Sequence, residues 1–347
     1  MNSLIFASTR RGAGKTSLLV GLAKTLEGPF GYLKPLGDQL LYRKKRLWDA
    51  DAALMIALLG VSHEPERLTV GFDHSKLRHL GDEAAIHNAV REALRVQCDG
   101  GGSVLIECGP NLTYGASVFL DPLTLSHELR LPTVLVTGGD ENEIADDLAF
   151  VERFVTSDEA TIAGVIVNKV RDLDEFTAVH LEEITRLGIP VLGVVPHDER
   201  LTTMTGNYLA ERLFARVIAG EEGLSKPVRH VLVGAMSVAA VTAEERFRLP
   251  DKLIITSGDR SDMILAALDA PGTSCVLLSN NIVPPANVLA TAQEKEVPLL
   301  LVPTDTYATA LKIDRLVPRL SVQDTGKIDR LAAIAAEHID LKAIAAL

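Results

Sequence analysis

The sequence predicts an α/β protein, with a doubly wound, mostly parallel sheet followed by a second, smaller α/β domain. Three observations support this fold class. Short apolar runs alternate with amphipathic segments, the runs are uninterrupted rather than alternating in polarity, and the cycle restarts after a linker. Uninterrupted apolar runs are typical of strands buried on both faces of a parallel sheet. Strand–helix alternation implies right-handed crossovers that place helices on both faces.

The first domain is predicted over residues 1–222. We expect its strands at runs rich in Val, Ile and Leu: Ser3–Ala7, Gly31–Lys34, Ser103–Glu107, Thr133–Thr137, Gly164–Asn168 and Val191–Val195. The clearest helices are predicted at Ala52–Leu59, Glu83–Val96, Glu141–Phe154 and Glu175–Leu187. Because ligands of such sheets bind beyond the carboxyl ends of the strands, we expect the functional residues there.

A linker rich in Gly, Glu and Pro follows at 220–227, and a second domain is predicted over residues 228–347. Its strands are expected at Val231–Val233, Leu253–Thr256, Cys275–Leu278 and Pro298–Val302. Its helices are expected at Ser261–Ala267, Pro285–Glu294 and Thr306–Ile313. The Ala-rich terminal region, Asp324–Leu347, is predicted to be helical. Its apolar side chains need a surface to cover, so we expect it on the second domain or on another subunit.

Composition excludes several classes of protein. The 347-residue chain is 47% hydrophobic and 23% charged, as globular proteins are, and its apolar runs are shorter than the roughly 20 residues of a membrane span. A net charge of −11 argues against nucleic acid as a main partner. Residues 1–7 are expected to form a strand rather than a secretory signal, and three scattered cysteines fit neither a disulfide framework nor a zinc site. We therefore expect a cytoplasmic protein without a membrane or nucleic-acid partner.

The segment ASTRRGAGKTS lies between the first predicted strand and a helical pattern. Gly14, Lys15 and Thr16 match the end of the phosphate-loop pattern G-x-x-x-x-G-K-[ST], whereas Thr9 stands at its first glycine position. Small residues let backbone N–H groups surround phosphate oxygens, and the helix directs its positive end to the same point. Lys15 offers a charge to the phosphates and Thr16 a hydroxyl to magnesium. The loop predicts a bound nucleotide, held by Arg11, Gly12, Ala13, Gly14, Lys15, Thr16 and Ser17.

Magnesium prefers oxygen ligands, commonly one or two carboxylates. Glu107 ends an apolar strand at the predicted ligand edge, where an unpaired buried acid would be costly. Asp51 is expected in the first turn of a helix, either as a second metal ligand or as the N-cap, although Asp49 could fill the capping role. Lys34 follows the second strand and either approaches the γ-phosphate or is a surface lysine.

Three further residues have two interpretations each. Arg10 and Arg11 lie within the loop, where an arginine could stabilise a transferring γ-phosphate, or the two could form a solvent-facing pair. Asn168 ends a later strand, where its amide could contact adenine or cap a turn.

Five separated motifs carry a family resemblance: ASTRRGAGKTS, GYLKPLGD, DADAALM, LIECG and VIVNKV. They resemble the dethiobiotin-synthetase-like P-loop ATPases, which include dethiobiotin synthetase and the cobyrinic acid amidating enzymes, and the related N-terminal domain of long bacterial phosphotransacetylases. The resemblance implies ATP and Mg²⁺ as cofactors. It also implies that Thr16, Asp51 and Glu107 hold magnesium, that Lys34 approaches the γ-phosphate and that Asn168 contacts adenine.

The motifs depart from that family at two positions. Cys108 takes the place of a glycine after the glutamate, and Arg10 takes the place of the loop lysine of the related MinD-type ATPases. The first departure bears on the substrate pocket. The second bears on activation across a dimer, in which Arg10 could replace the lysine.

The second half resembles a DRTGG domain through VLVGAMSVAAV, LIITSGDRSDMILAAL and VPLLLVPTDTYATALKI. Residues 258–262, GDRSD, stand in place of the motif that names the domain. This turn precedes a predicted helix, so Gly258, Asp259, Arg260 and Asp262 form a candidate site for a small-molecule effector that carries a carboxylate or phosphate. Alternatively, Asp259 caps the helix and Arg260 pairs with a neighbouring acid.

Three functions fit these features. The first is a regulatory Mg-ATP-binding protein linked to phosphotransacetylase-type acyl-phosphate metabolism, which is favoured because we recognise no acetyltransferase domain in the sequence. The second is an ATP-dependent ligase that phosphorylates a carboxylate or carbamate, with Lys15, Lys34 and Arg10 as its catalytic residues. The third is a scaffold with a vestigial loop, against which the intact Gly14-Lys15-Thr16 argues. A homodimer is expected because the relatives pair and the terminal helix is apolar.

Overall fold

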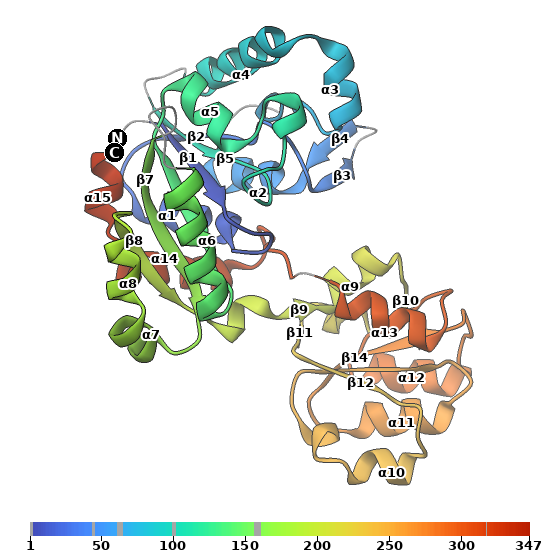
Figure 1. Ribbon diagram of the computed structural model, residues 1–347. Coiled ribbons are helices and arrows are strands. Elements are labelled where there is room, and N and C mark those ends of the chain that lie inside the picture. Colours follow the sequence, from blue (N-terminus) through green and yellow to red (C-terminus); the bar gives the residue numbers. More distant parts are fainter. Residues whose placement is uncertain (1–2, 44–45, 61–64, 99–101, 156–160, 317) are drawn as a thin grey trace. The chain divides into compact units, whose positions relative to one another are not determined.

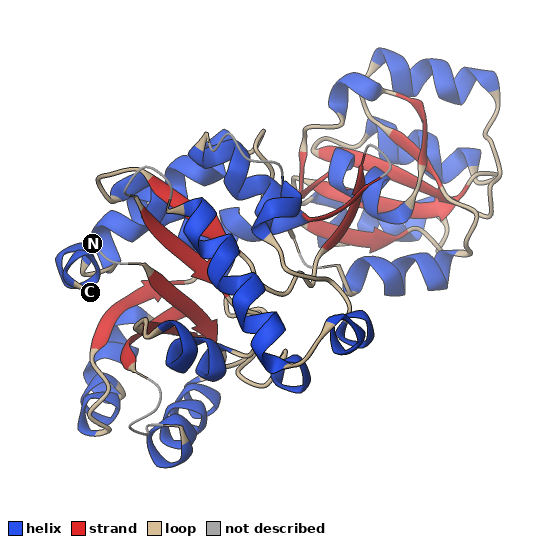
Figure 2. Ribbon diagram, turned by 90° about the horizontal axis from the view of Figure 1, so that it is seen from above, coloured by secondary structure: helices blue, strands red, loops and turns tan. Residues whose placement is uncertain are grey.

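The computed structural model describes residues 3–43, 46–60, 65–98, 102–155, 161–316 and 318–347. The chain divides into two compact units. Unit 1 comprises residues 1–198 together with 320–347, and unit 2 comprises residues 199–319. Each unit is built from strands and helices around its own sheet, as the two views show (Figures 1 and 2). The α/β class expected from the sequence is therefore confirmed.

The sheet of unit 1 has the strand order β2-β5-β1-β6-β7-β8, and each described pair is parallel. The strands are β1 Leu4–Ser8, β2 Phe30–Leu33, β5 Ser103–Glu107, β6 Thr133–Thr137, β7 Ile162–Val170 and β8 Val191–Pro196. Their uninterrupted apolar runs are buried as expected, since helices cover both faces. A separate hairpin pairs β3, Leu40–Arg43, with β4, Arg46–Asp49.

Helices of unit 1 divide between the two faces of this sheet. Side chains of α4, α5 and α6 pack on the face to which Ile5 and Ala7 point. Phe6, between these two residues in β1, points to the opposite face, and the described residues of α1 and α2 contribute nothing to the two clusters on the first face. The helices are α1 Lys15–Thr25, α2 Ala50–Leu59, α3 His74–Leu80, α4 Glu83–Gln97, α5 Pro122–Leu129, α6 Glu141–Phe154, α7 Leu173–Val179, α8 Leu181–Arg186, α14 Thr325–His338 and α15 Leu341–Ala346. Short 3-10 helices are η1 Pro65–Leu68 and η2 Ala116–Val118.

The terminal helical region packs on unit 1, which corrects the expectation that it covers the second domain or another subunit. Helix α14 lies against α1, where Gly21 leaves room: a Cβ at Gly21 would lie 2.6 Å from Leu331 O (Figure 1). A second glycine, Gly193 in β8, similarly admits the backbone at His338, and Arg330 pairs with Asp198 at 2.6 Å. The periodicity of the sequence shows that α14 has an apolar face. It cannot show what that face contacts, because the partner residues lie more than a hundred residues away in the chain.

Unit 2 begins at Glu199 rather than near the glycine-rich linker, so it includes α9 and β10 from the predicted first domain. Its sheet has the order β10-β15-β14-β13-β12, in which only the described pair β10–β15 is antiparallel. The strands are β10 Arg216–Ala219, β12 His230–Val233, β13 Lys252–Ser257, β14 Thr273–Ser279 and β15 Leu299–Leu301, and β9 Met204–Thr205 pairs with β11 Pro227–Val228.

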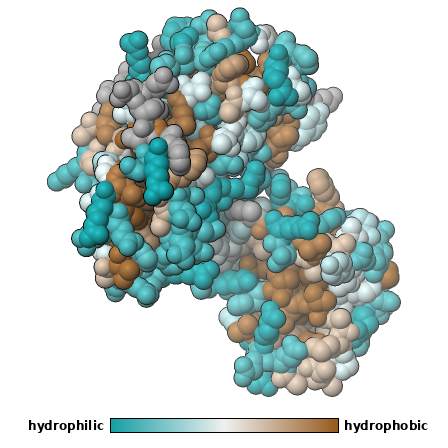
Figure 3. Space-filling view, in the orientation of Figure 1, coloured by the Kyte–Doolittle hydropathy of each residue, from teal (hydrophilic) through white to brown (hydrophobic). Residues whose placement is uncertain are grey.

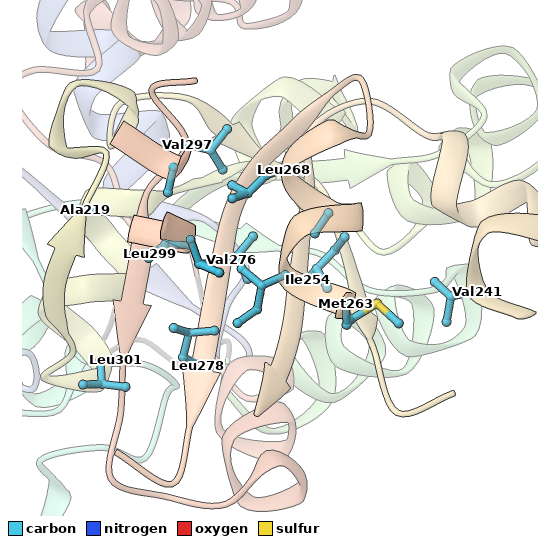
Figure 4. Packing of buried hydrophobic residues seen from close by; sticks show 14 of the residues in the cluster. Ala219, Val241, Ile254, Met263, Leu268, Val276, Leu278, Val297, Leu299 and Leu301 are labelled. Atoms are coloured by element: carbon cyan, nitrogen blue, oxygen red, sulfur yellow. The ribbon is translucent and has the colours of Figure 1, made fainter. Parts of the chain in front are cut away.

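Apolar residues on each face of this sheet pack against helices. On one face Met263 and Leu268 of α11 meet Ile254, Val276 and others from the strands (Figure 4). Helices α9 and α13 cover the other face. The helices are α9 Gly206–Leu213, α10 Val238–Ala243, α11 Ser261–Asp269, α12 Ala286–Glu294 and α13 Thr306–Asp314, with 3-10 helices η3 Glu199–Thr202, η4 Glu221–Gly223 and η5 Glu245–Arg248.

The visible surface carries mostly hydrophilic residues with separate hydrophobic patches (Figure 3). Within the described ranges, no helix combines the length and the apolarity that a bilayer crossing requires.

Candidate nucleotide-binding site

The loop between β1 and α1 turns through two glycines in left-handed conformations. Gly12 has φ +80° and Gly14 has φ +93°, a region that side chains other than glycine rarely adopt. Gly14 is also sterically required, because a Cβ there would lie 2.4 Å from Asn168 Nδ2. Thr9 occupies the first glycine position of the motif and donates from Oγ1 to Thr137 Oγ1 at 3.0 Å. The threonine that replaces the usual glycine at position 9 thus connects the loop to the end of β6 by a hydrogen bond.

Lys15 is the first residue of α1, and its ammonium lies beneath the loop. Nζ donates to Ser8 Oγ at 3.0 Å and to Gly109 O at 2.9 Å. Burial lowers the pKa of Lys15, although the nearby carboxylate of Glu107 opposes this shift. The ammonium is therefore fixed by neutral acceptors at the carboxyl end of β1 and just after β5.

Thr16 and Glu107 lie together, as the predicted metal site requires. Thr16 Oγ1 donates to Glu107 Oε1 at 2.7 Å, and the hydroxyl of Tyr32 donates to Oε2 at 2.8 Å. Glu107 ends β5 and is buried, and burial raises the pKa of its carboxyl group while Lys34 opposes the shift. The tyrosine was not singled out from the sequence, although it stands in β2 only two residues before Lys34.

Lys34 is buried rather than at the surface, and three acids surround it: Asp49 is buried, whereas Asp38 and Asp51 are partly exposed. Its Nζ is 2.5 Å from Asp51 Oδ2, 2.6 Å from Asp38 Oδ1 and 3.4 Å from Asp49 Oδ1. One oxygen from each of the three acids lies within 4.8 Å of the others. Burial disfavours the charged ammonium, but these carboxylates and Glu107 outweigh it and raise the pKa of Lys34 well above its ordinary value.

The N-cap of α2 is Asp49 and not Asp51. The sequence had left open which of the two acids caps this helix. Asp49 Oδ1 accepts from Asp51 N at 2.9 Å and from Ala52 N at 3.2 Å, while Oδ2 accepts from the backbone of Asp38 and Gln39. The carboxylate of Asp51 therefore does not cap the helix and points instead to Lys34.

The two loop arginines behave differently. Arg10 makes two hydrogen bonds of 2.8 Å to the Asp147 carboxylate and also pairs with Glu143, both on α6. Arg11 is exposed at the tip of the loop. The guanidinium of Arg10 thus pairs with acids of α6. The sequence had suggested either contact with a γ-phosphate or exposure to solvent, and neither interpretation included this pairing.

Asn168 and its neighbour Lys169 support the loop from β7. Asn168 Nδ2 donates to Ala13 O at 2.7 Å, and its Oδ1 accepts from Lys169 N at 2.9 Å. Lys169 has φ +65°, and its Nζ donates to Gly12 O at 2.7 Å. Sequence reasoning missed Lys169, because nothing in VIVNKV signals the left-handed turn that brings its side chain back to the loop.

In the turn at 258–262 of unit 2, the polar side chain of Arg260 binds mainly to nearby residues. Arg260 makes two hydrogen bonds to Asp262, at 2.9 and 3.1 Å, and a third to Met236 O at 3.1 Å. A Cβ at Gly258 would lie 1.7 Å from Ile282 O, so the glycine is needed for packing. Arg260 itself takes the N-cap position of α11, and Asp259 does not cap the helix. The pairing of Arg260 with a neighbouring acid agrees with the alternative interpretation.

The residues of unit 1 suit a magnesium–nucleotide complex. Thr16, Glu107 and Asp51 offer hydroxyl and carboxylate oxygens, the donor chemistry that magnesium prefers. Gly12 has no atom within 4 Å of the place where a Cβ would stand, so the loop is open on that side. Lys15 and the amino end of α1 supply positive charge at the same point.

Comparison with known sequences supports the two-domain organisation. The family model of the AAA domain matches residues 2–205, and that of the DRTGG domain matches residues 208–316. The phosphate acetyltransferase of Deinococcus radiodurans is 29% identical over 363 residues, with 98% of this chain and 50% of that protein covered. That of Synechocystis sp. is 30% identical over 229 residues, with 62% of this chain and 33% of that protein covered. The chain spans about half the length of the curated relatives it matches.

Similarity to solved structures is low. A ParA family ATPase from Chlorobium tepidum is 14% identical with a TM-score of 0.38, covering 58% of this chain and 87% of that one. The CBS and DRTGG domains of Clostridium perfringens pyrophosphatase, solved with diadenosine tetraphosphate, are 12% identical with a TM-score of 0.28, covering 44% of this chain and 72% of that one.

The family models confirm the resemblance seen in the motifs, and the curated relatives are phosphate acetyltransferases. Because the match over residues 2–205 covers more than half of the 347 residues, the chain belongs to the AAA domain family AAA_26, with a DRTGG domain following it.

Proposed function

We propose that unit 1 binds ATP with magnesium and that the chain acts as a regulatory module of phosphotransacetylase-type acyl-phosphate metabolism in the cytoplasm. The observation that carries this proposal is the buried Lys15 at the amino end of α1, beside the Thr16–Glu107 pair at 2.7 Å. A lysine held beneath a glycine-rich loop, next to a hydroxyl–carboxylate pair, is the arrangement that a triphosphate and its divalent ion need.

Each residue of the site has a proposed role. Backbone N–H groups of Gly12–Ser17 would contact the phosphates, and Lys15 would balance their charge. Thr16, Glu107 and Asp51 would hold magnesium, which neutralises charge on the phosphate oxygens. Asp51 is paired with Lys34 at 2.5 Å, so it would have to share its carboxylate or release the lysine to Asp38. Asn168 would contact adenine only by giving up its bond to Ala13 O.

Regulation is favoured over ligation by the extent of the sequence similarity. Matches to phosphate acetyltransferases cover 98% of this chain in the Deinococcus radiodurans and Pseudomonas putida proteins. In those proteins the matching half stands beside further sequence, which suits a module that responds to ATP. Arg10 is committed to Asp147 and Glu143, so a role in stabilising a transferring phosphate would require it to leave α6.

Two further parts of the proposal concern partners. A small-molecule effector could bind unit 2 at Gly258–Asp262 only in competition with the Arg260–Asp262 pair. We also propose a homodimer, now on the family resemblance alone, because α14 is already covered by α1. Light scattering of the full chain at several concentrations tests this part, and a monomer at every concentration would contradict it.

Calorimetric titration of ATP, with and without Mg²⁺, tests the proposed function. Lys15→Ala should remove most of the ATP affinity, whereas Lys24→Ala, a change of an exposed lysine on the same helix, should leave it unchanged. Equal affinity in the wild type and Lys15→Ala would contradict the site. ADP formation that depends on an added carboxylate or carbamate would favour the ligase alternative over regulation.

A further inference from the structure

We infer that Tyr32 is a positioning residue whose hydroxyl holds the Glu107 carboxylate in place for a divalent cation. This inference rests on the proposed function, because it concerns the acid that would hold magnesium.

The sheet register brings the two side chains together. Tyr32 of β2 lies opposite Leu105 of β5. Glu107 follows Leu105 by two residues and so points to the same face of the sheet. The side chains of Tyr32 and Glu107 therefore both point to the face that carries α1. The Tyr32 side chain is 0% exposed, and its hydroxyl donates to Glu107 Oε2 at 2.8 Å. Thr16 donates to the other oxygen at 2.7 Å. Each oxygen of the carboxylate therefore has one neutral hydroxyl donor.

Neighbouring cations are held away from Glu107 by other acceptors. Lys15 bonds to Ser8 Oγ and Gly109 O, and Lys34 lies among three aspartates. In the part of the chain that the structure describes, neither ammonium comes within ion-pair distance of Glu107. Among the described residues, the buried Glu107 carboxylate accepts hydrogen bonds only from hydroxyl groups, so no cation in direct contact balances its charge. A divalent ion would supply that charge.

Tyr32 and Thr16 then differ in what they do. Thr16 is itself a proposed metal ligand, so its hydroxyl would turn from Glu107 to the ion. Tyr32 approaches from β2, the edge strand of the described sheet, and its bond to Oε2 can persist while Oε1 changes partner. Partners of this kind orient a metal ligand, and losing one typically weakens metal affinity about 10- to 100-fold. Without Tyr32, Glu107 could also turn to one of the two lysines.

The test measures metal and nucleotide affinity separately in the full chain. Tyr32→Phe keeps the buried ring and removes only the hydroxyl, and Tyr42→Phe is the matched control, because Tyr42 is 72% exposed. Mn²⁺ is titrated into the protein–ATP complex, and ATP is titrated separately in the presence of EDTA. We expect Tyr32→Phe to weaken Mn²⁺ affinity about 10-fold or more and to leave metal-free ATP affinity unchanged, with Tyr42→Phe like the wild type in both.

Two results would overturn the inference: Mn²⁺ affinity that is the same in Tyr32→Phe and the wild type, or a parallel loss of Mn²⁺ and metal-free ATP affinity, which marks a merely structural hydroxyl. A wild type that binds no ATP would instead overturn the proposed function and the inference with it. Should Tyr32→Phe fail to fold, crystals of the wild type with ATP and Mn²⁺ decide: the Tyr32–Glu107 hydrogen bond persists beside the metal if the inference is correct and is absent if it is wrong.

Discussion

Lys34 Nζ lies 2.5 Å from Asp51 Oδ2 in the interior of unit 1, and Asp38 and Asp49 complete the group of acids around the ammonium. The Lys34 side chain is only 2% exposed, so its charge substitutes for water around these carboxylates. The same contacts connect the amino end of α2 to the end of β2, and they include Asp51, one of the proposed metal ligands.

Removing the ammonium should therefore destabilise unit 1. We expect Lys34→Ala to lower the free energy of unfolding by about 3–5 kcal/mol, because it leaves the buried Asp49 and the two partly exposed acids without a cation. Lys24→Ala, at an exposed position of α1, should change it by less than about 0.5 kcal/mol. Urea unfolding at neutral pH measures both. A Lys34→Ala protein as stable as Lys24→Ala would show that the acids are neutral or solvated.

The Arg10–Asp147 pair should make stability depend on acid pH. Burial alone would raise the pKa of Asp147, but hydrogen bonds from Arg10 lower it below its ordinary value of 3.8. Because the folded-state pKa is the lower one, the contribution is complete above the unfolded-state pKa and is lost as pH falls through the folded-state value. Asp147→Asn should lower stability by about 1 kcal/mol at pH 7 and by much less once the pH falls below the folded-state pKa of Asp147. A difference that does not change with pH would contradict this assignment.

The contact between α1 and α14 predicts a steric effect at Gly21. Gly21→Val should destabilise unit 1 by about 1–3 kcal/mol, because its Cβ would meet Leu331 O at 2.6 Å. Gly326→Ala, within α14, is the control: nothing lies within 4 Å of its Cβ position, so it should be neutral or stabilising by up to about 1 kcal/mol. Chemical unfolding and limited proteolysis of residues 320–347 report the result. Equal stability of the two variants would argue against this packing.

Gly258 of unit 2 should be a packing residue. Gly258→Ala would place a Cβ 1.7 Å from Ile282 O and should destabilise unit 2 by about 2 kcal/mol or more. ATP affinity of unit 1 should stay as in the wild type, which calorimetry can check. If Gly258→Ala were as stable as the wild type, the glycine would need another explanation, such as a ligand that approaches the turn.

Much of the fold could be predicted because it depends on local pattern. Uninterrupted apolar runs in β1, β5 and β6 mark strands buried on both faces, and a glycine-rich segment before α1 marks the loop that the structure shows. The direct Thr16–Glu107 contact also follows from topology, since parallel strands β1 and β5 end at one edge of the sheet.

Other features depend on contacts between distant segments. The prediction of where α14 packs was wrong. Its apolar face could cover any apolar surface, and the space that it occupies on α1 exists because residue 21 is a glycine. The pairing of Arg10 with α6 and the enclosure of Lys34 by acids require the positions of Asp147 and Asp38, which periodicity does not provide. Tyr32 was missed for the same reason: its hydroxyl has a role only once β2 lies beside β5.

Co-crystallisation of the full chain with ATP and Mn²⁺, with the metal located by its anomalous scattering, would show whether nucleotide and metal occupy the proposed site. We predict that the triphosphate lies on the loop before α1, with the metal peak beside Thr16 Oγ1 and the Glu107 carboxylate. A metal peak elsewhere, or a loop that stays empty at saturating ATP, would contradict the assignment of the nucleotide-binding site to unit 1.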